Sequence, residues 1–168
     1  MAMAKAKAKT KAPPPRRAKS SARKSVAARS AVKARTKPSG YSKWPKQTFV
    51  VSHPREKDYK QGFRSYAKYR DLGVAKATKG AVVAHVIRLL GRCDPVEVSK
   101  RHHHDVDFQI IYMLKGWMKG EYNGRKVTMR PGTCWIQPRR IKHTVLDYSP
   151  DCEMLEIVLP AEFDTVEL

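Results

Sequence analysis

Short hydrophobic runs separated by turn residues dominate the chain from residue 47 onward. The runs are rich in β-branched and aromatic residues, and Gly or Pro recurs between them at intervals of about ten residues. They lie at 81–90, 108–114, 117–122, 126–129, 133–137, 143–146 and 153–159. Asn123-Gly124 separates two of them and is the strongest short-range hairpin signal. The pattern predicts an all-β sandwich or closed barrel, while residues 53–72 do not settle between helix and strand.

Residues 1–46 have a different composition from the rest of the chain. They hold 15 basic residues and no acidic one, whereas residues 47–168 hold 20 basic and 15 acidic residues. A segment with this charge and so little apolar surface cannot offset the entropy of ordering. We therefore expect a disordered basic tail at 1–46 and one folded domain at 47–168. The tail favours non-specific binding to nucleic acid through counterion release. An anionic membrane surface or a solvated extension without a partner are the alternatives.

Cysteine usage and hydropathy indicate a cytoplasmic protein. The three cysteines are an odd number and form no CxxC pair, which argues against a disulfide framework and a zinc ribbon. No apolar run is long enough to span a bilayer, and no apolar block follows the N-terminal charges as in a secretory signal. An organelle transit peptide fits the acid-free N-terminus less well, because branched aliphatic residues are scarce there.

A run of histidines suggests a metal site. His102 and His104 are two residues apart, so in an extended segment their side chains point to the same face. His143 begins another predicted strand and offers a third imidazole. Imidazole sets of this kind suit Zn, Fe, Mn, Ni or Cu. The alternative is an exposed histidine cluster beside basic residues.

The spacing around these histidines resembles the two motifs of the cupin superfamily, HxH-x4-E-x6-G followed by PG-x5-P-x4-H. The matching positions here are His102, His104, Gln109, Gly116, Pro131, Gly132, Pro138 and His143. The resemblance covers residues 82–163, about the whole folded part. It implies a double-stranded β-helix, or jelly-roll barrel, with one divalent metal ion (Fe, Mn, Ni or Zn) in its mouth. It also implies a small-molecule ligand and a homodimer.

The resemblance implies a ligand set of His102, His104, Gln109 and His143. The family's acidic ligand is replaced by Gln109, a neutral amide that we expect to act weakly or indirectly. Tyr112 and Trp135 are candidates for the pocket wall, with barrel core as the alternative. Arg139 could bind a substrate carboxylate, with an exposed turn as the alternative.

Two classes of function follow. The first is a metal-dependent enzyme, such as an oxygenase, an isomerase or a decarboxylase, acting on a small oxygen-rich or anionic molecule. The second is a non-catalytic ligand-binding or sensor cupin, with the tail tethering it to nucleic acid. Nucleotide cofactors, serine hydrolysis and zincin chemistry find no support, because GxGxxG, P-loop, GxSxG and HExxH motifs are lacking.

Overall fold

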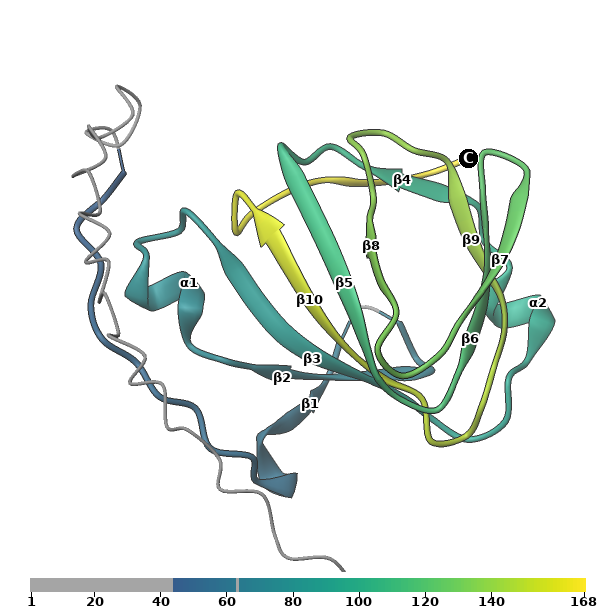
Figure 1. The fold of residues 1–168 in the computed structure, drawn as a ribbon, viewed down its shortest axis with the longest axis horizontal. Coiled ribbons are helices and arrows are strands. Elements are labelled where there is room, and N and C mark those ends of the chain that lie inside the picture. The colour runs from purple at the N-terminus through teal and green to yellow at the C-terminus, as the bar shows by residue number, and fades with distance from the viewer. Residues whose placement is uncertain (1–43, 63) are drawn as a thin grey trace, which may run out of the picture. The chain divides into compact units, whose positions relative to one another are not determined.

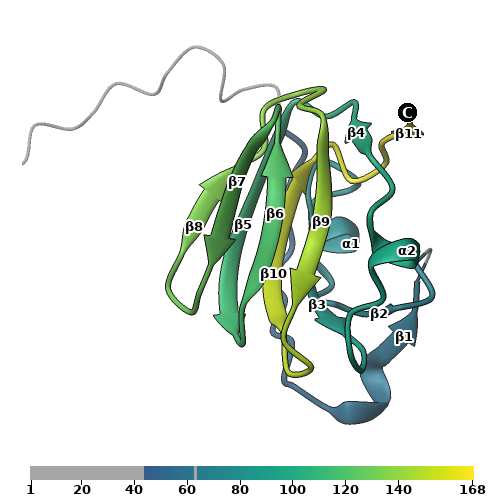
Figure 2. The same cartoon turned by 90° about the vertical axis from the view of Figure 1, so that its right-hand side faces the viewer.

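A computed structural model describes residues 44–62 and 64–168 of the chain. Residues 1–43, which make up most of the predicted disordered tail, lie outside the described part. The described residues form two antiparallel sheets that face each other (Figures 1 and 2), so the prediction of an all-β jelly-roll barrel is confirmed. No helix in these residues is long and apolar enough to cross a membrane.

The first sheet has six strands, with β10 between β3 and β5 near its middle. In order across the sheet these are β1 (Tyr59–Gln61), β2 (Ala67–Asp71), β3 (Val83–Leu89), β10 (Glu153–Leu159), β5 (Phe108–Lys115) and β8 (Cys134–Ile136). Most neighbours in space are far apart in sequence, as expected for a jelly roll.

The second sheet has five strands and carries all three candidate histidine ligands. Its order is β11 (Thr165–Glu167), β4 (His102–His104), β9 (His143–Tyr148), β6 (Met118–Tyr122) and β7 (Arg125–Met129). The helices are short: the 3₁₀ turn η2 (Glu56–Asp58), α1 (Val74–Ala77) and α2 (Pro95–Val98).

All seven predicted strands are present, with ends shifted by at most two residues. The undecided stretch 53–72 contains η2, β1 and β2. It becomes strand because β2 pairs with β3 over five positions, a contact with a segment that lies outside the stretch itself. Strand β11 was not anticipated, since its three residues carry too short a pattern to read.

Alternation along β5 fixes which side chains face the inside of the barrel. Gln109, Ile111 and Met113 are at most 2% exposed, whereas Phe108 and Tyr112 on the opposite face are exposed. Methionines from three other strands complete the core with Ile111 and Met113. They are Met118, Met129 and Met154. Gln109 is therefore a polar side chain on an interior face that is otherwise apolar.

Two turns between strands contain residues with positive φ. Asn123 and Gly124 both have positive φ (47° and 85°) in the two-residue connection between β6 and β7, as a type I′ hairpin requires. Gly116, which ends the first motif, also has positive φ (66°), between β5 and β6. A Cβ at Gly116 would lie 2.2 Å from the Ser149 Oγ and 2.9 Å from the Cys152 Cα. The motif glycine is therefore required by both conformation and space.

We expect Gly116→Ala to lower the free energy of unfolding by more than Gly124→Ala does. Both substitutions place a side chain at positive φ, which costs about 1–3 kcal/mol. Only Gly116→Ala adds a steric overlap, because nothing lies within 4 Å of a Cβ at Gly124. Urea unfolding of both variants measures the difference, and equal losses would contradict the prediction.

Candidate metal centre

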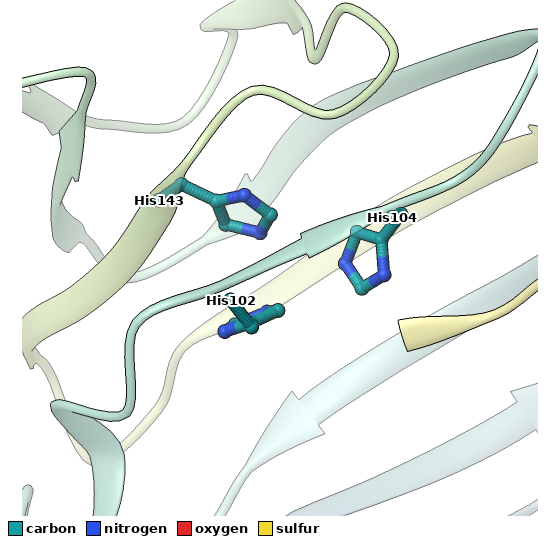
Figure 3. Close-up of side chains that lie close together, drawn as sticks. All are labelled: His102, His104 and His143. Atoms are coloured by element: carbon teal, nitrogen blue, oxygen red, sulfur yellow. The ribbon is translucent and has the colours of Figure 1, made fainter. Parts of the chain in front are cut away.

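Three imidazole rings meet inside the second sheet, at the junction of β4 and β9. His102 is paired directly with His143 across the two strands, and His104 lies two residues further along β4 on the same face. The ring centroids are 4.3 Å apart for His102 and His143, and 5.1 Å apart for each of the other pairs. One nitrogen from each ring lies within 4.8 Å of the others (Figure 3). The predicted convergence of the three histidines is what the structure shows.

Hydrogen bonds fix the orientation of the rings. The Nδ1 of His102 lies 2.8 Å from the Lys100 carbonyl oxygen, and the Nδ1 of His143 lies 2.9 Å from that of Ile141. A carbonyl oxygen only accepts, so Nδ1 carries the proton and Nε2 keeps its lone pair in both rings. The Nδ1 of His104 contacts the Thr165 hydroxyl at 2.9 Å. This is the arrangement in which metal-bound histidines are held, so the donor set fits a metal ion.

Burial keeps these imidazoles neutral. It lowers the pKa of His104 and of His143 to about 4, and it also lowers the pKa of His102. Neutral rings offer lone pairs at physiological pH without first losing a proton. Aromatic side chains supply part of the burial: Tyr122 stacks on His143 at 5.7 Å, and Phe163 packs edge-on against His104 at 5.4 Å.

Two cavities adjoin the histidines. The smaller has a volume of about 100 Å³, and its wall includes all three rings. The larger has a volume of about 500 Å³, and its wall includes His104, Arg64, His85 and Glu156. His104 and Glu156 line both cavities. A small molecule in the larger cavity would therefore lie against the rim of the histidine site.

Gln109 lies inside the barrel, but its amide is engaged by other side chains. Its Nε2 donates to the Glu156 Oε1 at 2.6 Å, and its Oε1 accepts from the Gln137 Nε2 at 3.4 Å. The same Gln137 Nε2 donates to the His143 Nε2 at 3.1 Å, so in the metal-free protein it occupies the lone pair that a metal ion would use. Gln109 is thus linked to the histidine cluster through Gln137.

The three predicted ligand-binding residues differ in position. Trp135 lines the smaller cavity with the histidines. Tyr112 does not reach either cavity, because it lies on the outer face of β5 with 42% of its surface exposed. Arg139 also lies away from both cavities, and it forms an ion pair with Asp105 beside the turn. Tyr112 is one residue from the interior position Ile111, and the sequence alone could not fix that alternation.

Glu156 is the functional-site residue that the sequence analysis missed. Its Oε2 lies 2.6 Å from the Nε2 of His85, which sits directly opposite on β3. Burial by itself raises the pKa of the Glu156 carboxyl, but the hydrogen bonds from His85 and Gln109 outweigh it and hold the pKa below its usual value. Glu156 lies two residues from the buried Met154 and two from the buried Val158, so all three point to the same face of β10. A carboxylate on the interior face of a predicted strand is the feature of the sequence that could have identified it.

Comparisons with known proteins support the resemblance to cupins. Residues 90–158 match the family model described as "Cupin domain". KdgF from Halomonas sp. is similar in structure, with a TM-score of 0.54 and 21% identity over 68% of this chain and 94% of that one. The polyketide cyclase RemF from Streptomyces resistomycificus has a TM-score of 0.56 and 18% identity, covering 71% of this chain and 86% of that one.

A more distant likeness is to salicylate 1,2-dioxygenase from Pseudaminobacter salicylatoxidans. Its TM-score is 0.52 at 7% identity, over 64% of this chain and 32% of that one. No curated protein matches the chain. Fold and site define a β-barrel protein with a three-histidine pocket. Residues 90–158 of this barrel match a cupin domain.

For the metal-free protein we expect His102 and His143 to be Nδ1-protonated tautomers. We also expect His104 and His143 to take up a proton only near pH 4, where their folded-state pKa values lie. An unfolded histidine titrates at about 6.5, so protonation favours unfolding. Stability is then complete above about pH 6.5 and falls as the pH drops toward the folded-state pKa values. Nitrogen NMR of the imidazoles during a pH titration measures both properties. Either ring titrating near its unfolded value would contradict this prediction.

Proposed function

We propose that this cupin binds one divalent metal ion through His102, His104 and His143, and that it transforms a small oxygen-rich or anionic molecule beside the ion. The observation that carries the proposal is the convergence of three neutral, oriented imidazoles within 4.8 Å. Three histidines with open positions are a chemically reasonable set for catalytic Zn, Fe, Mn or Ni. Gln109 takes part indirectly, since its amide oxygen and nitrogen already have side-chain partners.

The protein's own residues would bind and orient the molecule in the larger cavity. Arg64, which also forms an ion pair with Glu167 at 2.7 Å, presents a guanidinium suited to anionic groups at the cavity wall. Tyr69 and Phe163 supply apolar surface, and His85 with Glu156 supplies a hydrogen-bonded acid–base pair. When bound, the ion would polarise an oxygen of the molecule as a Lewis acid.

A catalytic role is supported by the position of the His85–Glu156 pair and by the names of two proteins with similar structures. The carboxylate and imidazole of Glu156 and His85 line the same cavity as His104, so they can exchange protons with a molecule bound there. Two of the structural relatives are named as a cyclase and a dioxygenase. The cupin fold itself does not select a reaction, so catalysis is inferred from the residues of the site.

The metal site is tested by the metal content of the untagged protein after incubation with Fe²⁺, Mn²⁺, Ni²⁺ or Zn²⁺. We expect about one ion per chain in the wild type and background levels in His102→Ala/His104→Ala, because a single remaining imidazole binds weakly. Elemental mass spectrometry measures the stoichiometry.

His103→Ala is the matched control. It removes the same side chain from the same strand, but from the position between the two that share the inner face. This variant should retain the metal. A wild type that stays metal-free with every ion would overturn the proposal.

We further propose that residues 1–46 bind nucleic acid non-specifically. The support is their charge of +15 with no acidic residue, against +5 for the remaining residues. Cationic segments of this kind gain affinity by releasing counterions from phosphates. The predicted homodimer and cytoplasmic location stay predictions.

Deletion of residues 1–46 should abolish retention on DNA. The full chain should bind in low salt, with affinity falling by a slope of about −0.9 per neutralised phosphate in a logarithmic plot against salt concentration. Retention on immobilised duplex DNA at several salt concentrations measures this. Equal retention of the truncated protein would place the interaction elsewhere.

A further inference from the structure

We propose that Glu156 supplies the negative charge of the metal site, in place of the acidic ligand that Gln109 replaces, and that it acts through Gln109 without touching the ion. This inference rests on the proposed metal-binding function. Toward the metal ion, Glu156 is a positioning residue whose negative charge compensates that of the ion. Its carboxylate lies outside the set of ligand atoms that gather within 4.8 Å, which contains the three histidines.

The Glu156 carboxylate lines the same small cavity as the three histidines. The Glu156 side chain is 13% exposed. Among the described residues that line the smaller cavity, it is the sole carboxylate. Three neutral imidazoles leave the charge of a divalent ion uncompensated. A buried carboxylate is costly unless a cation or hydrogen-bond donors balance it. His85 and Gln109 supply hydrogen bonds to the carboxylate. An ion held by the three histidines would add a Coulombic attraction to it across a poorly solvated interior.

A hydrogen bond connects Glu156 to Gln109, the position of the family's acidic ligand. Gln109 and Glu156 lie on adjacent strands, where Gln109 is paired with Val158, two residues from Glu156. This diagonal relation allows long side chains to meet, and the Gln109 Nε2 donates to the Glu156 Oε1 at 2.6 Å. The negative charge therefore lies on Glu156, one hydrogen bond away from Gln109 at the family's ligand position.

His85 holds the other side of the Glu156 carboxylate. Its second oxygen contacts the His85 Nε2 at 2.6 Å, and His85 packs edge-on against Tyr69 at a centroid distance of 5.2 Å. With one oxygen held by His85 and the other by Gln109, the carboxylate has a fixed position. Removal of a partner that is hydrogen-bonded to a metal ligand typically weakens metal binding by a factor of about 10–100, and we take this range as the expected size of the charge effect of Glu156.

The experiment measures the dissociation constant for Zn²⁺ of the full chain by competition with a chromophoric chelator. We expect Glu156→Gln to bind Zn²⁺ about 10- to 100-fold more weakly than the wild type. The exchange variant Gln109→Glu/Glu156→Gln moves the carboxylate from position 156 to position 109. It should restore wild-type affinity for Zn²⁺ or exceed it. Glu153→Gln, on the same strand but paired with Arg88 away from the cavity, should bind as the wild type does.

Each outcome has a separate meaning. Undiminished affinity in Glu156→Gln, or an exchange variant as weak as Glu156→Gln, would overturn the role of Glu156. Wild-type binding that His102→Ala/His104→Ala does not reduce would instead overturn the proposed metal site. If Glu156→Gln alone fails to fold, His85→Gln/Glu156→Gln removes the charge and its partner together. The same loss of affinity is then expected, and its absence overturns the proposal.

Discussion

The site depends on the pairing of β4 with β9. This contact is narrow, because β4 has three residues and the paired position is His102 with His143. Other contacts hold the same corner. The Arg140 backbone N–H donates to the His104 carbonyl oxygen at 2.9 Å, and both Arg139 and Arg140 form ion pairs with Asp105 at the end of β4. Each exposed ion pair contributes little by itself, but together they fix the turn that delivers His143.

The interior of the barrel is divided between an apolar part and a polar part. Buried methionines and aliphatic residues form the apolar core, while Gln109, Gln137 and Glu156 place amide and carboxylate groups inside the same barrel. Such groups are costly unless their hydrogen bonds are satisfied. The chain Glu156–Gln109–Gln137–His143 satisfies them with one another, and it ends at a ring of the three-histidine cluster. A barrel selected for stability alone would carry apolar residues at these positions.

Relatives of this fold include proteins with different named activities, so the barrel is a scaffold whose chemistry is set by a few side chains. In this chain the pocket joins three neutral imidazoles with one anchored carboxylate and an imidazole partner. A cavity of about 500 Å³ lies against them and has room for a small molecule. The arrangement combines a place for a cation with groups that can bind and exchange protons.

The sequence by itself determined seven of the strands and the Asn123-Gly124 hairpin, because these follow from local alternation and local backbone geometry. The need for glycine at 116 also depends on the close approach of Ser149 and Cys152, which the tertiary structure decides. The two-residue period also placed His102 and His104 on one face. Only the tertiary structure decided which face of each strand is interior, and so placed Ile111 inside and Tyr112 outside. It alone brought Glu156 to His85, 71 residues away in sequence. Contacts between distant strands depend on the packing of the whole barrel, and a pattern within one segment cannot encode that choice.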